Sequence, residues 1–420
     1  MGVVRLLPPI LEIFIVWHPD DAVGPRLADA IFAHFTQGHT FSGVIGGGIQ
    51  VSLRSAGWES AGSAPRPIYV EGSPAPNGIP PANFVAVVPL LGTEMAKKTQ
   101  VVDSSWHRFI STIEGMESKA QKRFGVFPYL LSDNAMNGTE LSRILGKYQR
   151  IKGDGQNQNG EDFSTLCRDL TQGIAQLISP GRKNRLTAFI SHTKQHDYNE
   201  GEDTNSLIGL IIEMIGKSRL DKFFDASDLQ PGTDWDAELR KKSRTSAMLA
   251  IRTDLYSSRE WCQREVVIAK THGMPVIVMD AIDHGEKRGS FLMDHVPRIA
   301  VRKSPEGYWR RQDVHRALNL LVDECLKRAL WIRQKELAQG RFGFDIDWWA
   351  PHAPEPLTLS HWIDNCVRQK LKGKKNFRIL HPDPPLGPEE QRVLLNYARN
   401  TRLGREIDIM TPSQLAMRSG

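Results

Sequence analysis

Trp261 and Glu265 are the residues whose types and spacing point most directly to chemistry in this chain. They are four positions apart, so on a helix they share one face and lie about one turn from each other. An aromatic ring beside a carboxylate is suited to holding a flat nicotinamide or adenine and to stabilising a cationic sugar carbon. NAD cleavage is therefore the leading hypothesis. The plainer alternatives are a solvated helix residue for Glu265 and a core residue for Trp261.

This pair must be positioned by a strand, a turn and a helix. Residues 247–251 are apolar and predict a buried strand, and residues 266–270 continue the helix that carries the pair. Ligands of parallel α/β sheets collect at the carboxyl ends of strands. Ser191 and His192 end the predicted strand 186–192, and Asp225 ends the predicted strand 221–225. We expect these side chains to meet the turn at 252–254.

The rest of the chain shows the same alternation of apolar strands and amphipathic helices, which predicts an α/β fold with parallel sheets. At 420 residues the chain is long enough for two or three domains. We divide it into an α/β domain at 1–150, a linker and helix at 151–183, an α/β domain at 184–305, and a long helix with a small α/β unit at 306–420. In this last segment, residues 348–351 and 354–356 are interpreted as an irregular connector.

Composition excludes several classes of protein. Hydrophobic residues make up 40% and charged residues 24%, as in ordinary globular proteins, and no apolar run reaches the roughly 20 residues of a membrane span. The net charge of +6 is spread over 54 basic and 48 acidic residues, which favours a solvated surface, so nucleic acid is not an expected partner. The four cysteines form no CxxC pair, which predicts a reduced, cytoplasmic protein without a disulfide framework or a metal site.

Four stretches carry a family resemblance through their order and spacing. They are AFISH at 188–192, FDASDLQPG at 224–232, TDLYSSREWC at 253–262, and the Trp-x-x-x-Glu pattern of Trp261 and Glu265. Together they resemble the Toll/interleukin-1 receptor (TIR) domain family in its bacterial, NAD-cleaving form. The resemblance covers about 115 residues. It implies a flavodoxin-like sheet of five parallel strands.

The resemblance also implies a reaction and a site. Enzymes of this family hydrolyse NAD+ at the nicotinamide–ribose bond or cyclise the ADP-ribose, and Glu265 corresponds to their catalytic glutamate. Ser191, His192 and Trp261 are expected to line the substrate site. NAD+ is the substrate, and no cofactor or metal is expected. For His192, a surface or cap histidine remains the plainer alternative.

The loop after the second predicted strand supplies two further candidates. Asp225 follows a strand and is a candidate for binding ribose hydroxyls; its alternative is an N-cap or turn residue. Gly232 permits backbone conformations that other residues resist and lets a ligand approach; its alternative is the turn that it makes with Pro231.

The first domain resembles a second, diverged TIR-like fold. Four residues after Trp106 stands Ile110 in place of a carboxylate, and His18-Pro19-Asp20 replaces the Ser/His pair. We interpret this domain as a non-catalytic binding or assembly module. The overall hypothesis is an NAD+ nucleosidase activated by TIR self-association, in bacterial antiphage defence. Two alternatives stay open: an enzyme that makes a cyclic ADP-ribose signal for a separate effector, and a non-enzymatic TIR scaffold. The trigger molecule or partner protein also stays open.

Overall fold

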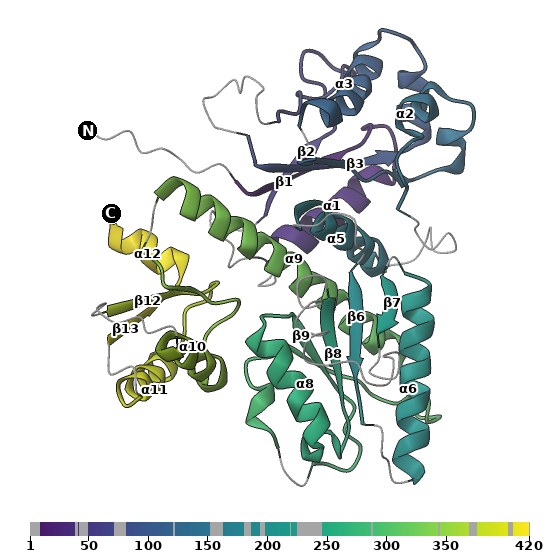
Figure 1. Cartoon of the computed structure of the whole chain (residues 1–420). Helices are drawn as coiled ribbons and strands as arrows, with labels where there is room; N and C mark the ends of the chain where they lie inside the picture. Colours follow the sequence, from purple (N-terminus) through teal and green to yellow (C-terminus); the bar gives the residue numbers. More distant parts are fainter. Residues whose placement is uncertain are drawn as a thin grey trace. The chain divides into compact units, whose positions relative to one another are not determined.

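The computed structural model of the chain forms two compact units, Met1–Arg182 and Lys183–Gly420. The described residues are 9–37, 41, 49–70, 81–120, 122–151, 163–179, 186–193, 198–218, 220–224, 246–286, 289–342, 345–368, 376–401 and 406–419. Figure 1 shows strands alternating with helices in both units. Among the described residues, every strand pairing within the three sheets is parallel, so the predicted α/β class is confirmed.

The sheet of the first unit is built around two adjacent buried strands. Its strand order is β2-β1-β3-β4, and β5 also pairs with β3. The strands are β1 (Leu11–Val16), β2 (Gln50–Arg54), β3 (Phe84–Leu91), β4 (Phe124–Val126) and β5 (Tyr129–Leu130). The short strands β4 and β5 are separated by Phe127 and Pro128. A proline has no N–H to donate to a ladder, which explains the interruption.

Helices of the first unit pack on this sheet through apolar residues. They are α1 (Gly24–Thr36), α2 (Thr93–Thr99), α3 (Ser105–Lys119), α4 (Glu140–Leu145), α5 (Ser164–Ile178) and the 3₁₀ turn η1 (Asp133–Met136). The helices α2, α3 and α4 share one hydrophobic core with β1, β3 and β4. The helix α5, which was expected to lead into the next domain, belongs to the first unit and contacts β3 and β4.

The first sheet of the second unit has the order β10-β9-β8-β6-β7. Its strands are β6 (Thr187–Ser191), β7 (Asp221–Phe224), β8 (Ser246–Arg252), β9 (Val276–Asp280) and β10 (Arg298–Ala300). Read from β7, the chain order is 2-1-3-4-5, so β8 is the central strand and β6 lies between β7 and β8. The strands β6 and β8 are almost completely buried, as expected for a sheet with both faces covered.

Successive residues of a strand point to opposite faces of the sheet, so each face of this sheet has its own apolar side chains. Helices cover both faces. Ile190 and Leu249 share a core with α6 (Tyr198–Gly216) and with the first half of α9 (Arg311–Phe342). Their neighbours Phe189 and Met248 share a core with α8 (Glu260–Thr271) and the turn η4 (Phe291–Met293). In Figure 1, α6 and α8 accordingly lie on opposite sides of the strands. The turn η3 (Tyr256–Ser258) joins β8 to α8.

A three-stranded sheet completes the second unit. The strands β11 (Trp348–Trp349), β12 (Asn376–Leu380) and β13 (Glu406–Met410) pair in the order β11-β12-β13. The helices are α10 (Pro356–Arg368), α11 (Pro388–Arg399) and α12 (Pro412–Ser419). The interpretation of 348–351 as an irregular connector was wrong in part, because Trp348 and Trp349 pair with Ile379 and Leu380. A strand of two residues is too short to show a periodic pattern in the sequence.

Candidate active site

The carboxyl ends of β6 and β8 adjoin at the centre of the five-stranded sheet. Ser191 ends β6, and Thr253 directly follows β8. The chain leaves β6 toward α6 on one face and leaves β8 toward α8 on the other. Strand ends whose connections diverge in this way leave a crevice between them, and this is where open α/β sheets bind ligands. The site predicted at this edge therefore lies where the connections that follow neighbouring strands go to opposite faces of the sheet.

Glu265 points into this region from α8. Its residue is only 3% exposed, and its Oε2 accepts a hydrogen bond from the Ser191 hydroxyl at 2.5 Å. A solvated surface glutamate, the plainer alternative, does not describe this side chain. Buried carboxylates are rare unless they are paired or hydrogen-bonded, and here the strand end supplies the donor.

Tyr256 completes a chain of hydroxyl groups behind the carboxylate. Its Oη lies 2.6 Å from the Ser191 Oγ, and its residue is fully buried. Burial raises the pKa of Tyr256 well above its usual value, and the charges of Cys262 and Glu265 act in the same direction. The phenol therefore stays protonated. Since the single proton of Ser191 goes to Glu265, Tyr256 is the donor in its contact with Ser191.

His192 lies at the exit of β6, and its ring contacts the backbone of Thr193. Its Nδ1 is 2.9 Å from the Thr193 carbonyl oxygen, which can only accept, so Nδ1 carries the proton. The His192 carbonyl oxygen accepts a weak bond from the Cys262 Sγ at 3.6 Å. The Thr193 and Thr253 hydroxyls lie 3.4 Å apart beside it. The His192 ring and carbonyl oxygen are thus both engaged at the exit of β6.

Trp261 occupies the first turn of α8 and is 42% exposed. It is not the core residue that its aromatic type allowed. The Arg264 guanidinium lies 6.0 Å from the centroid of its ring. Trp261 and Glu265 do come from successive turns of one helix, as predicted. They nevertheless have different environments, because the ring reaches solvent and the carboxylate reaches the strand ends.

Asp225 and Gly232 lie outside the described residues. Their proposed roles in binding ribose and in the loop therefore remain predictions.

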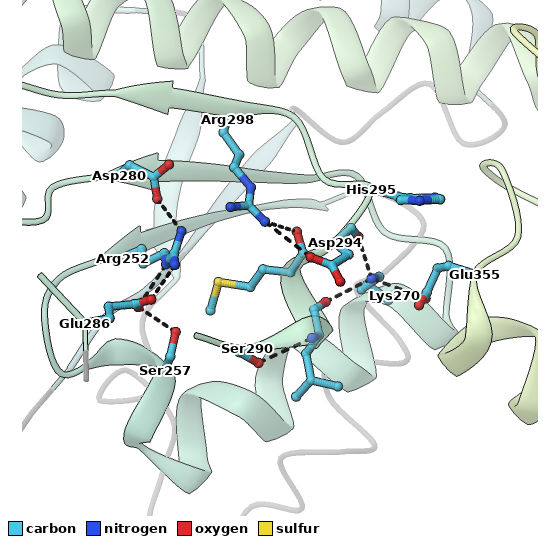
Figure 2. A network of polar contacts seen from close by, with 12 residues as sticks. Arg252, Ser257, Lys270, Asp280, Glu286, Ser290, Asp294, His295, Arg298 and Glu355 are labelled. Atoms are coloured by element: carbon cyan, nitrogen blue, oxygen red, sulfur yellow. Dashed lines mark hydrogen bonds and ion pairs between the residues drawn. The ribbon is translucent and has the colours of Figure 1, made fainter. Parts of the chain in front are cut away.

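Sequence reasoning missed an ion-pair network that supports η3. Figure 2 shows Arg252, at the end of β8, between Asp280 and Glu286. Its Nε donates to Glu286 Oε1 at 2.9 Å, its Nη2 donates to Glu286 Oε2, and its Nη1 donates to Asp280 Oδ1 at 3.0 Å. Ser257 Oγ donates to the same Glu286 Oε1 at 2.6 Å. Burial raises the pKa of Glu286, but the bonds from Arg252 and Ser257 outweigh it and lower that pKa.

The loop after β9 is fastened to the same turn. The Asp254 carboxylate accepts backbone N–H groups from Asp283, His284 and Gly285 at 2.9 to 3.1 Å. Together with the pairing of Glu286, these bonds hold residues 281–286 against the segment that carries Tyr256. The sequence does not reveal these hydrogen bonds, because their partners are about 30 residues apart and an Asp in a turn gives no signal of a distant partner.

The far end of α8 is fixed by Lys270. Its Nζ donates to the carbonyl oxygens of Leu292 and Asp294 at 2.9 Å each, and it lies 3.2 Å from Oε1 of Glu355 (Figure 2). Burial lowers the pKa of Lys270, although Glu355 opposes that shift. Glu355 also accepts the N–H groups of Leu357 and Thr358 at the start of α10. The helix that carries Glu265 is therefore anchored to the neighbouring α10.

The corresponding strand end of the first unit has different chemistry. Ile110 is fully buried in the core, so α3 presents no carboxylate four residues after Trp106. Asp21, the nearby acid, accepts the N–H groups of Glu94 and Met95 at the start of α2. A Cβ at Gly92 would lie 2.2 Å from that carboxylate, so no side chain fits there. His18 packs against Trp106, with ring centroids 5.0 Å apart.

Three observations bear on other kinds of site. Among the described residues, no group of three or more His, Cys, Asp or Glu side chains is arranged to hold a metal ion. The four cysteines are buried, and none of them forms a disulfide. None of the helices in the described part of the chain combines the length and apolar character needed to cross a membrane.

Comparisons with known proteins do not decide the family. No protein-family model matches the chain, and no curated protein matches it. The function must therefore be inferred from the residues and their geometry.

Proposed function

We propose that this protein is a TIR-type enzyme that cleaves NAD+ at the nicotinamide–ribose bond, with Glu265 as the catalytic residue. The observation that carries the proposal is the buried carboxylate of Glu265 beside the end of β6, bonded to Ser191. A buried acid at strand ends where such sheets bind ligands, bonded to the Ser191 hydroxyl that Tyr256 supports in turn, has the character of a functional group.

The fold supports this proposal. The chain-order 2-1-3-4-5 of the strands β6 to β10 is the order of flavodoxin-like sheets, which the TIR resemblance implies. The first unit repeats its first four positions as β2-β1-β3-β4. A shared topology without a carboxylate at Ile110 agrees with a first unit that binds or assembles and does not catalyse.

The chemistry requires little beyond a fixed negative charge. As the bond between C1′ and the pyridinium nitrogen breaks, nicotinamide leaves with the electron pair as a neutral molecule. The ribose becomes oxocarbenium-like, and a nearby carboxylate stabilises that charge. Water then adds to C1′ and loses a proton, which gives ADP-ribose. In this proposal Ser191 and Tyr256 hold Glu265 in one orientation, and Trp261 supplies an aromatic surface for the nicotinamide or adenine.

The test compares two glutamates of the same helix. Purified full-length protein is incubated with NAD+, and nicotinamide, ADP-ribose and cyclic ADP-ribose are quantified. Glu265→Gln preserves the shape and removes the charge, so we expect a loss of roughly 10²–10³ in rate. Glu260→Gln, at the exposed start of α8, should retain most of the activity. Near wild-type cleavage by a folded Glu265→Gln protein would reject the assignment.

The same experiment separates the alternatives. Nicotinamide with linear ADP-ribose supports the hydrolase, and nicotinamide with the cyclic product supports a signal-producing enzyme. No nicotinamide at any protein concentration leaves the non-enzymatic scaffold. If self-association activates the enzyme, turnover per molecule should rise with protein concentration, which sedimentation of the same samples can relate to oligomeric state.

A further inference from the structure

A cavity of about 250 Å³ lies in the first unit, between the loop that follows β2 and the helix α3. Its apolar lining includes Ile68, Phe109 and Met116, which are at most 8% exposed. Its wall also includes Trp58, which is 61% exposed. The volume is just below the roughly 300–1,000 Å³ of pockets for drug-sized ligands, so a smaller metabolite fits best.

The loop that carries Trp58 is built to hold it in place. Trp58 N–H donates to the Ala64 carbonyl oxygen at 3.0 Å, and the hydroxyl of Ser63 accepts the N–H of Ser60 at 3.1 Å. Ala64 N–H donates to the Ser105 hydroxyl of α3 at 3.1 Å, which ties the loop to the helix. A Cβ at Gly57 would lie 2.2 Å from a backbone oxygen. This ordered loop keeps a large aromatic ring beside the cavity while much of that ring meets solvent.

One side of the Trp58 ring already has a cation. The Arg66 guanidinium lies 5.3 Å from the ring centroid, an arrangement that fixes the indole by a cation–π contact. An immobilised ring loses less conformational freedom when a ligand packs on it, so it contributes more to affinity than a mobile one.

Two opposite charges line the same cavity without pairing with each other. Glu59 and Arg108 both contribute to its wall, and both are exposed. Arg108 Nη1 donates to the carbonyl oxygen of Asp103 at 2.5 Å. Within the described ranges, neither side chain takes part in an ion pair. The cavity therefore offers a cation and an anion, each able to meet a complementary group of a ligand.

We propose that this cavity binds a free α-amino acid with an aromatic or large apolar side chain. The side chain lies against Trp58, Phe109 and Met116, the carboxylate meets the Arg108 guanidinium, and the ammonium meets the Glu59 carboxylate. A guanidinium matches a carboxylate in shape as well as in charge. Glu59 would repel a ligand with several negative charges, so a nucleotide or a nucleic acid fits this wall less well than a zwitterion.

This site lies in the first unit and does not depend on Glu265 or on NAD+. It would make that unit a small-molecule sensor, a role beyond NAD+ cleavage. Binding by a Glu265→Gln protein should equal binding by the wild type, so failure of one proposal can be told apart from failure of the other.

The experiment titrates full-length protein with L-tryptophan and L-phenylalanine, by calorimetry and by saturation-transfer NMR. Tryptamine lacks the carboxylate, and indole-3-propionate lacks the ammonium group, so each probes one charge. Arg108→Gln and Glu59→Gln should each weaken L-tryptophan binding by roughly tenfold or more. Lys119→Gln removes an exposed cation from the same helix α3 and should leave the affinity unchanged.

The result that supports the proposal is saturable binding of an amino acid that both charge variants weaken and Lys119→Gln does not. Trp58→Ala should also weaken it, and Trp58 is exposed enough for its replacement to leave the fold intact. Absence of saturable binding up to millimolar L-tryptophan and L-phenylalanine would overturn the proposal. Binding that Arg108→Gln and Glu59→Gln leave unchanged would also overturn it. So would binding of tryptamine and indole-3-propionate that is as strong as the binding of L-tryptophan.

Discussion

Ser191 at the end of β6 donates a hydrogen bond of 2.5 Å to Glu265 on α8, 74 positions further along the chain. Tyr256 donates in turn to Ser191, so the carboxylate ends a chain of two hydroxyl groups. The three residues come from a strand, a 3₁₀ turn and a helix. The position of the carboxylate is thus set by three elements together.

We expect Ser191→Ala and Tyr256→Phe each to lower kcat for NAD+ cleavage by roughly tenfold, because each removes part of the support of a charged group. The double variant should lose little more than either single variant, since both changes break the same chain. A double-mutant cycle on kcat measures this coupling. Ser258→Ala removes an exposed hydroxyl from the same turn and serves as the control. Additive losses would mean that the two hydroxyls act independently.

Trp261→Ala should change affinity for substrate more than stability. The ring is 42% exposed, so its removal creates no core cavity. If the ring packs on the nicotinamide or adenine, KM should rise roughly three- to tenfold with a smaller effect on kcat. Phe291→Ala removes a ring that is 68% exposed elsewhere in the same unit and should not affect KM. An unchanged KM in Trp261→Ala would exclude contact between this ring and the substrate.

Arg252→Met should destabilise the second unit by about 3 kcal/mol, because it leaves the Glu286 carboxylate buried without its cation. The side chains of Arg252 and Glu286 are 15% and 6% exposed. The double variant Arg252→Met/Glu286→Met should cost less than the single one, since no unpaired charge remains. Urea denaturation measures both. Arg392→Met breaks an exposed pair with Glu389 and should cost less than about 1 kcal/mol.

His34 gives the first unit a predictable response to acid. Its Nε2 lies 2.8 Å from the Thr171 hydroxyl, which joins α1 to α5, and burial lowers its pKa to about 4. The unfolded chain binds this proton near the ordinary pKa of about 6.5. The contribution of the neutral His34 to the free energy of unfolding is therefore complete above about pH 6.5. It is lost progressively as the pH falls toward 4, by on the order of 2–3 kcal/mol.

Hydrogen exchange of α1 and α5 between pH 7 and pH 4 measures this loss, after correction for the intrinsic exchange rates. A His34→Gln protein keeps a polar group but does not titrate, so its protection should depend less on pH in this range. His284→Gln removes an imidazole whose side chain is 88% exposed and should behave like the wild type. Equal pH dependence in His34→Gln and the wild type would contradict the assignment.

The sequence by itself determined the local elements and the class of the fold. The strands predicted at 186–192, 221–225 and 247–251 lie within two residues of β6, β7 and β8, because burial on both faces of a parallel sheet demands continuous apolar runs. The four-residue spacing of Trp261 and Glu265 correctly predicted one helix for both. The short strand Trp348–Trp349 was missed because two residues carry no periodicity.

Only the tertiary structure decided what each of these residues faces. The packing of α8 on the sheet exposes Trp261 and buries Glu265, and a helical pattern alone does not distinguish these outcomes. Tyr256 lies 65 positions from Ser191, and Glu286 lies 34 positions from Arg252. Such partners meet because parallel strands bring their carboxyl ends to one edge of the sheet. Which side chains then touch depends on packing between elements, for which sequence spacing holds no signal.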